Sequence, residues 1–102
     1  MTSTQRLATP LSIGPVVLPN RVFLAPLSGI TDEPFRQRAD RHGAGLVVSE
    51  MVASGELAKG REKSALRIRR PDVDVHMVQL AGRDATAMAE AARIEAGEGA
   101  DI

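Results

Sequence analysis

The chain has 102 residues, of which 43% are hydrophobic and 25% are charged, a composition typical of one soluble globular domain and unlike a disordered or collagen-like chain. Its 13 Lys and Arg residues balance 13 Asp and Glu residues, so no net charge draws it toward nucleic acid or a membrane surface. Zero cysteines exclude disulfides, thiolate zinc sites and a cysteine nucleophile within these residues, and two aromatic residues are too few for a base-stacking platform.

Residues 1–10 carry no apolar segment of a secretory signal, and we expect them to form a flexible N-terminus. No apolar run in the chain reaches the roughly 18 residues that a membrane span needs. We therefore expect a cytoplasmic protein with no membrane partner.

Residues 11–18 predict a small hairpin, because Gly14-Pro15 lies between two short apolar runs. The next run, 22–25, is apolar at every position, as in strands that are buried on both faces of a parallel sheet. Pro26 has no N–H for a sheet ladder and is expected to end this strand.

A helix is predicted over residues 33–42. Thr31 or Asp32 can cap its first turn, and Pro34 is tolerated there because its missing N–H has no partner in a first turn. Gly43 follows the last residue, where a glycine commonly ends a helix. Three residues fall on one face of this helix: Phe35, Ala39 and His42.

The strand–helix cycle then repeats. Further buried strands are predicted at 46–48, 75–80 and, opening at the end of the chain, 100–102. Helical structure is predicted for part of Ala53–Arg70 and for about 85–96, where Asp84 supplies the cap.

Alternating buried strands and helices, with strands that begin roughly 25 to 30 residues apart, predict the α/β class with a parallel sheet. The residues after the first strand, 26–29, do not match the glycine-rich fingerprint of a doubly wound dinucleotide-binding fold. A (βα)8 TIM barrel fits better and needs about 250 residues. We therefore predict that residues 11–102 form the N-terminal portion of such a barrel, with about three βα units after the hairpin, truncated at the start of its fourth strand.

Functional groups of a parallel barrel gather at the carboxyl ends of its strands. Polar residues stand at two of these ends, Ser49-Glu50 after the second strand and Gln79 near the end of the third. The Gln79 amide could pair with the alternating donors and acceptors of a heterocycle, or it could bond neighbouring backbone. Glu50 likewise has two interpretations: it orients a neighbouring loop through backbone N–H groups or an Arg, or it contacts substrate.

The segment Lys59–Arg70 concentrates positive charge, with six Lys or Arg residues against one Glu, a local net charge of +5. A solvated helix face and a contact with RNA phosphates both fit this pattern. No group of residues has metal-ligand spacing, and no serine lies in a nucleophile elbow, so we expect no metal. His42 suits the last turn of a helix, and His76 is expected in a core or an interface.

Several segments together resemble one family, the FMN-dependent tRNA-dihydrouridine synthases, and within it the bacterial B-type branch. The matching segments cover nearly everything after Ile13 and are Leu18–Pro26, Gly29–Arg36, Gly43–Met51, Val78–Gly82, Ala89–Ile94 and Gly99–Ile102. Asn20-Arg21 before an Ala-Pro strand end is shared with old-yellow-enzyme flavoproteins. The Gly-Ile-Thr-Asp-x-Pro-Phe-Arg and Ser-Glu-Met segments at these spacings make the likeness specific.

This resemblance implies an FMN-binding TIM barrel with a small helical domain behind it. It also implies the NADPH-linked reduction of a flipped-out tRNA uridine to 5,6-dihydrouridine at the flavin, with a cysteine acid that supplies a proton. FMN and NADPH are thus the expected cofactors, and tRNA is the expected partner.

Carried over residue by residue, the resemblance places Pro26, Leu27 and Ser28 against the flavin ring, mainly through backbone. It also implies that Gln79 hydrogen-bonds the polar edge of the ring. The family commonly has Met-Ala where this chain has Leu27-Ser28. Leu keeps the apolar volume of Met, and a backbone contact survives either change, whereas a specific sulfur contact is lost.

In the family, the strand that opens at residues 100–102 leads into an Asn-x-Gly-Cys-Pro loop with the acid cysteine, so the catalytic acid is expected beyond Ile102. We expect the 102 residues alone to be inactive, to bind FMN weakly or not at all, and to be poorly soluble because a sheet edge and an apolar face stay uncovered. Two alternatives come from other classes: a fragment of an old-yellow-enzyme-type flavin oxidoreductase, and a non-functional product of a truncated gene. The sequence indicates neither an oligomeric state nor which tRNA uridine is modified.

Overall fold

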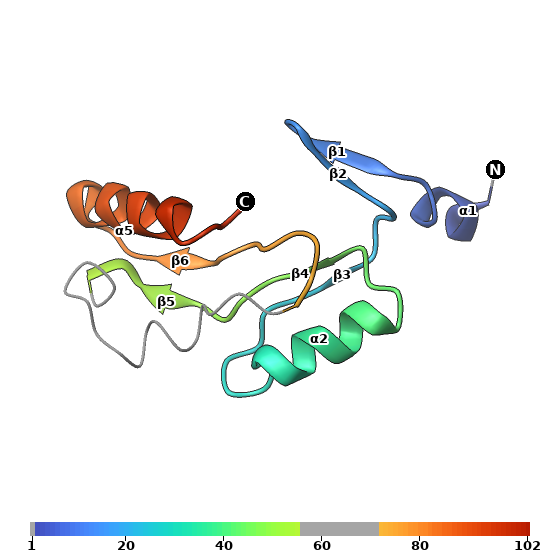
Figure 1. Cartoon of the computed structure of the whole chain (residues 1–102), viewed down its shortest axis with the longest axis horizontal. Coiled ribbons are helices and arrows are strands. Elements are labelled where there is room, and N and C mark those ends of the chain that lie inside the picture. Colours follow the sequence, from blue (N-terminus) through green and yellow to red (C-terminus); the bar gives the residue numbers. More distant parts are fainter. Residues whose placement is uncertain (1, 56–71) are drawn as a thin grey trace.

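The computed structural model describes residues 2–55 and 72–102 of the chain. Three helices lie among six strands along these described residues, and the strands that pair after the hairpin run in the same direction (Figure 1). In chain order the elements are α1 (Ser3–Leu7), β1 (Leu11–Ile13), β2 (Val16–Leu18), β3 (Phe23–Leu24), α2 (Glu33–Arg41), β4 (Leu46–Val47), β5 (Val52–Ala53), β6 (Leu80–Ala81) and α5 (Ala85–Gly97).

Three sequence predictions fall on the N-terminal segment or on residues 56–71, which the structure does not describe. The basic run Lys59–Arg70 lies outside the described residues, as does most of the stretch from Ala53 that was predicted to be partly helical. Ala53 itself ends strand β5, and the next two residues, Ser54 and Gly55, are helical, in agreement with a partly helical stretch. Helix α1 lies within residues 1–10, where Thr2 and Gln5 cap it reciprocally; the flexibility of this segment stays a prediction.

The predicted hairpin is confirmed. Strands β1 and β2 pair antiparallel, with Leu11 opposite Leu18 and Ile13 opposite Val16. Gly14 turns the chain between them with a φ of 56°, a left-handed conformation that a glycine adopts without steric cost. Leu18 is fully buried and packs with Leu46 and Val48, so the hairpin closes one end of the hydrophobic core.

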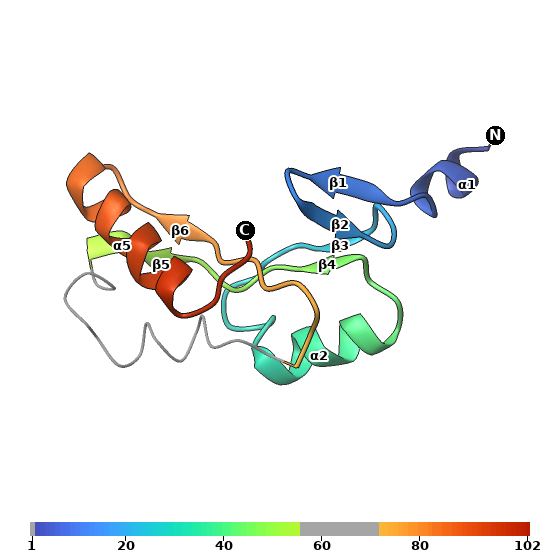
Figure 2. The ribbon, with the colours of Figure 1, turned by 45° about the horizontal axis from the view of Figure 1, so that its top comes forward.

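The predicted parallel sheet is confirmed in its pairing. Strand β3 pairs in parallel with β4, with Phe23 opposite Leu46, and an isolated parallel bridge joins Val48 to Met77. Strands β5 and β6 continue this pairing in parallel. Helix α2 lies beside β3 and β4, and α5 lies beside β5 and β6 (Figures 1 and 2).

The end of the chain adds a fourth parallel segment, as predicted. The Asp101 N–H donates to the His76 carbonyl at 2.8 Å, and the Val78 N–H donates to the Ile102 carbonyl at 3.0 Å. Each of the four parallel segments therefore neighbours the one before it in the sequence. This neighbour order is the one that successive βα units produce.

The predicted third strand, 75–80, is wrong in its bounds. Only Leu80 of that range belongs to strand β6, and Met77 forms a single bridge. Between these two pairings, three residues (49–51) separate Val48 from Val52, whereas two residues (78–79) separate Met77 from Leu80 on the neighbouring segment. The extra residue is the count that defines a β-bulge, and it interrupts the ladder at Ser49–Met51.

Helix α2 begins and ends as the sequence predicts, with the Asp32 carboxylate accepting from the Phe35 N–H at 3.0 Å and Gly43 following at a φ of 101°. Its buried side differs from the expected face. Phe35 is 44% exposed and His42 is exposed, whereas Arg36 is buried to 1% exposure. The physical reason is polar: the Arg36 guanidinium is held by the loop in front of the helix, as described below.

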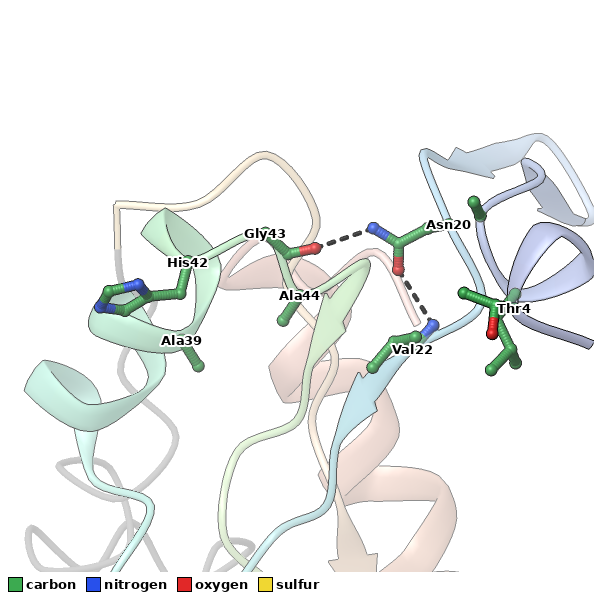
Figure 3. Close-up of a pocket in the computed structure, with 9 residues that line it drawn as sticks. Thr4, Asn20, Val22, Ala39, His42, Gly43 and Ala44 are labelled. Carbon is green, nitrogen blue, oxygen red and sulfur yellow. Dashed lines mark hydrogen bonds between the residues drawn. The ribbon is translucent and has the colours of Figure 1, made fainter.

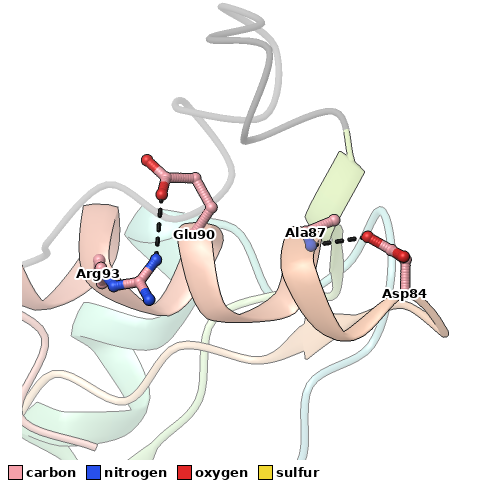
Figure 4. Close-up of polar contacts among 4 residues, drawn as sticks. All are labelled: Asp84, Ala87, Glu90 and Arg93. Atoms are coloured by element: carbon pink, nitrogen blue, oxygen red, sulfur yellow. Dashed lines mark hydrogen bonds and ion pairs between the residues drawn. The ribbon is translucent and has the colours of Figure 1, made fainter.

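Helix α5 also follows the prediction. The Asp84 carboxylate accepts from the Ala87 N–H at 2.8 Å and caps its first turn (Figure 4). Ala91 is fully buried, and the residues packed against it are Val78, Leu80 and Ile94. No helix among the described residues is both long and apolar enough to cross a membrane.

The start of β3 is joined to the start of β4 by the side chain of Asn20. Its Nδ2 donates to the Gly43 carbonyl at 2.8 Å, and its Oδ1 accepts from the Val22 N–H at 2.9 Å (Figure 3). The Gly45 N–H donates to the Val22 carbonyl at 2.7 Å. A Cβ atom on Gly45 would collide with both the backbone carbonyl and the side chain of Asn20, so this junction requires glycine.

We expect Gly45→Ala to lower the free energy of unfolding by about 1–3 kcal/mol, the usual cost of overpacking a tight contact. Gly97→Ala is the matched control, because nothing lies within 4 Å of its Cβ position and Ala favours a helix by about 1 kcal/mol over Gly. Urea denaturation measures both. Equal stability of the two variants would contradict the close approach of Asn20 to Gly45.

Candidate functional site

The segment after β3 holds three of the residues that the sequence assigned to a cofactor. Pro26 is partly buried, Leu27 is 49% exposed and Ser28 is exposed. They lie at the carboxyl end of a parallel strand, where side chains and loops are free to meet a ligand.

This segment is a closed turn built around Thr31. The Thr31 hydroxyl accepts from the Leu27 N–H at 2.8 Å and approaches the Leu27 carbonyl at 3.2 Å, to which it donates. The Ile30 and Thr31 N–H groups also donate to that carbonyl, at 2.9 and 3.0 Å. Because Thr31 is fully buried, these bonds are shielded from water and hold the exposed residues 27–28 in one conformation.

Glu50 holds the same turn from the neighbouring strand. Its Oε2 accepts from the Gly29 N–H at 2.8 Å, and its side chain is only 5% exposed. Gly29 has a φ of 77°, so the turn needs a residue that adopts the left-handed region. The interpretation that Glu50 orients a neighbouring loop through backbone is confirmed.

Arg36 lies beneath the turn. Its Nη1 donates to the Thr31 carbonyl at 2.8 Å. Burial lowers the pKa of the Arg36 guanidinium, and the carboxylates of Glu50, Glu33 and Asp32 act in the opposite direction, raising it. The buried positive charge is thus offset by nearby negative charges, Glu50 contributing the most among them.

Gln79 stands on the other side of Glu50. The sequence placed its side chain within a buried strand, but the structure leaves it exposed beside the bulge. Its backbone N–H donates to the Ser49 Oγ at 3.3 Å, and the Ser49 N–H donates to the Met77 carbonyl at 2.9 Å. Within the described parts of the chain, the Gln79 side-chain amide forms no hydrogen bond, so its carbonyl and its NH2 group are both available to a ligand.

The residues present fit the edge of a planar heterocycle. An exposed apolar side chain, Leu27, stands on a rigid turn, and an exposed amide, Gln79, offers one acceptor and one donor group. The adjacent residues Ser49 and Glu50 accept from the backbone N–H groups of Gln79 and of Gly29 in the turn, respectively. No metal site accompanies them: among residues 2–55 and 72–102, no His, Asp or Glu cluster could hold a metal ion.

Sequence reasoning missed two residues of this arrangement, Thr31 and Arg36, and it singled out Ser49 without assigning it a partner. Thr31 was considered only as a helix cap, a role that Asp32 fills. Arg36 has the spacing of a solvent-facing helix residue, and only the position of Glu50 on another element explains its burial. The signal in the sequence was the polar pair Ser49-Glu50 directly after a buried strand.

Asn20 and Arg21 act at the opposite ends of the strands. Arg21 donates through Nε to the Thr9 hydroxyl at 3.0 Å and through Nη2 to the Pro10 carbonyl at 3.0 Å, which ties the N-terminal segment to β3. A groove of about 530 Å³ lies there between α1 and the end of α2, with Asn20 and His42 on its wall (Figure 3). His76 is buried, as expected, and its backbone N–H donates to an Asp101 carboxylate oxygen at 2.8 Å.

The chain is similar to known proteins over most of its length. The family model for dihydrouridine synthase (Dus) matches residues 23–102. A probable tRNA-dihydrouridine synthase of Rhizobium leguminosarum bv. phaseoli is 60% identical over 83 residues, which are 81% of this chain and 26% of that protein.

Two relatives with the name tRNA-dihydrouridine synthase B show the same coverage. The protein of Pseudomonas aeruginosa is 50% identical over 88% of this chain and 27% of its own length, and that of Pasteurella multocida is 44% identical over 90% and 28%. The chain therefore spans about a quarter of the length of the curated relatives it matches. No solved structure matches it.

We expect Thr31→Val to lower the free energy of unfolding by about 1–3 kcal/mol, because the Leu27 N–H then loses its acceptor inside the turn. Thr86→Val, at an exposed position of α5, is the control and should stay within about 0.5 kcal/mol of the parent. Thermal or urea unfolding measures both changes. A Thr31→Val protein as stable as the control would show that the turn does not depend on this hydroxyl.

Proposed function

Because this chain belongs to the dihydrouridine synthase family, we propose that the protein containing it is a tRNA-dihydrouridine synthase. In this proposal the protein is an FMN-dependent, NADPH-linked oxidoreductase that converts uridine in tRNA to 5,6-dihydrouridine. In this proposal the protein acts on tRNA in the cytoplasm.

The observation that carries the proposal is the pairing of a rigid turn with an exposed amide. Glu50 and Thr31 hold residues 26–29 on one side, and Ser49 holds the backbone of Gln79 on the other. Bound FMN would supply hydride transfer, the redox chemistry that protein side chains lack. The chain's own part is to bind and orient the ring.

Each candidate residue has a distinct part in that binding. Pro26 and Ser28 offer their backbone, and Leu27 offers an exposed apolar surface that suits a flat aromatic ring. The Gln79 amide pairs with the polar edge of the ring, where its two groups match an acceptor and a donor. These four residues are the cofactor contacts that we propose for this chain.

The four proposed contacts do not make a complete site. The 102 residues contain no cysteine, so they do not supply the proposed acid that protonates uracil C5. The pairing of four parallel segments in chain order supports a (βα)8 barrel for the complete domain. Whether the basic run Lys59–Arg70 binds tRNA phosphates or is a solvated surface stays open, and both interpretations are kept.

The old-yellow-enzyme alternative loses its main support. It rests on Asn20-Arg21, and both residues hold backbone segments together at the ends of the strands opposite the candidate site. Their presence therefore indicates a shared way of starting a strand and carries no information on substrate.

We expect Gln79→Ala, in the full-length protein, to weaken FMN binding about tenfold, the effect of one lost hydrogen bond of about 1.4 kcal/mol. Gln37→Ala on α2 is the control and should bind FMN as the parent does. Titration of the apoprotein by flavin fluorescence gives the affinities, and mass spectrometry of tRNA nucleosides gives the dihydrouridine formed. A parent protein that forms dihydrouridine while Gln79→Ala binds FMN unchanged would remove Gln79 from the site.

We expect the purified 102-residue chain to carry no stoichiometric flavin and to form no dihydrouridine. The reason is that Leu27, Ser28 and Gln79 are all exposed in it, so few contacts would bury the ring. Visible absorbance near about 450 nm, where bound flavin absorbs, is the measurement, with the full-length protein as the positive control. A band of one flavin per chain would overturn this expectation.

A further inference from the structure

We propose that Ser49 and Glu50 together act as positioning residues that set the two proposed flavin contacts of this chain relative to each other. Ser49 positions Gln79, and Glu50 positions the turn that carries Leu27 and Ser28. This inference rests on the proposed function and assigns the two residues roles that a purely structural pair would not have.

The bulge allows two adjacent residues, Ser49 and Glu50, to bond to the two neighbouring segments, that of Gln79 and that of Gly29. A regular strand directs successive side chains to opposite faces in strict alternation. Here one extra residue lies between the pairing of Val48 and that of Val52, and a bulge re-aims the side chains within it. Ser49 and Glu50, both inside this stretch, are 0% and 5% exposed.

Ser49 grips the strand segment of Gln79 at two points. Its N–H donates to the Met77 carbonyl at 2.9 Å, and its Oγ accepts from the Gln79 N–H at 3.3 Å. The hydroxyl thus takes the place of the backbone carbonyl that a regular ladder would supply to this N–H. The backbone N–H of Gln79 thus has an acceptor, and the Gln79 side chain is exposed with its carbonyl and NH2 groups available.

Glu50 reaches the other side of the site. Its carboxylate accepts from the Gly29 N–H at 2.8 Å, directly after Leu27 and Ser28 in the sequence. The same carboxylate is the largest of the charges that offset the buried Arg36, whose Nη1 supports the turn from below at the Thr31 carbonyl. Glu50 therefore fixes the turn by a direct bond, and together with Glu33 and Asp32 it offsets the buried charge of Arg36.

The consequence is a specific pattern of coupling. If Ser49 acts on the cofactor only through Gln79, removing the hydroxyl costs affinity only while the Gln79 amide is present. If Glu50 acts through the turn, its effect persists after Gln79 is removed. A residue that only stabilises the fold would not show an effect on FMN affinity that depends on the Gln79 amide.

The test is a double-mutant cycle for FMN binding to the full-length apoprotein, followed by flavin fluorescence. We expect Ser49→Ala to weaken binding about tenfold in the parent and by less than about twofold in a Gln79→Ala background. We expect Glu50→Gln to weaken binding about tenfold in both backgrounds, because a neutral amide is a weaker acceptor and leaves Arg36 with less compensating charge. Ser49→Thr keeps the hydroxyl and should restore parental affinity.

The controls are matched residues away from the site. Ser12→Ala lies on the exposed hairpin, and Glu90→Gln lies on α5, where Glu90 forms only a solvent-exposed pair with Arg93 (Figure 4). Both should bind FMN as the parent does. The visible absorbance of bound flavin provides a second readout, and we expect its band to shift in Ser49→Ala but not in either control.

Four outcomes would overturn the proposal. The first is a Ser49→Ala effect of equal size with and without Gln79, and the second is parental affinity in both Ser49→Ala and Glu50→Gln. The third is equal loss of affinity in Ser49→Ala and Ser49→Thr, a comparison that decides the Ser49 assignment even if Glu50→Gln fails to fold. The fourth is a parent protein that takes up no FMN, and this outcome alone would also overturn the proposed function.

Discussion

The hydrogen bond from the Gly29 N–H to the buried carboxylate of Glu50 is the contact on which the candidate site depends. It joins the turn after one strand to the end of the next strand, across 21 positions of sequence. Without it, Arg36 would be a buried cation with less compensation, and the turn of residues 26–31 would rely on Thr31 alone. A buried charge that is paired in this way resists change because each partner is costly to leave alone.

The short strands β3 and β4 are joined at both ends by polar side chains with different tasks. At their starts, Asn20 binds the Gly43 carbonyl and the Val22 N–H, and Gly45 admits it by having no side chain. At their carboxyl ends, the buried carboxylate of Glu50 accepts from the Gly29 N–H. The junction at Asn20 fixes how β3 and β4 align, and the bond at Glu50 fixes the turn that carries the exposed residues 27–28. This division follows the general separation of stability and function between the two ends of a parallel sheet.

Much of the fold could be predicted because its signals are local. The hairpin at Gly14, the cap at Asp32, the glycine end of α2 and the cap at Asp84 each depend on residues within a few positions of one another. The positions of the strands could be predicted from runs of apolar residues, and the family from motifs at fixed spacing. The predicted burial holds for β4 but is wrong for β3, where Phe23 is 42% exposed. The bounds of the third strand could not be predicted, since the bulge at Ser49–Met51 depends on how two distant segments pair.

The sequence by itself predicted the hairpin, helices α2 and α5 with their caps and the parallel pairing of the strands, and through the family resemblance it proposed residues 26–28 and 79 as cofactor candidates. The tertiary structure alone decided which polar groups are buried. Arg36 is buried with a bond to the Thr31 carbonyl of the preceding loop and with the charge of Glu50 nearby, and Gln79 is exposed at an interrupted ladder where the Ser49 hydroxyl accepts from its backbone N–H. Burial of a polar group depends on its partners, and Glu50 and Ser49 lie too far along the chain from Arg36 and Gln79 for a local pattern to identify them.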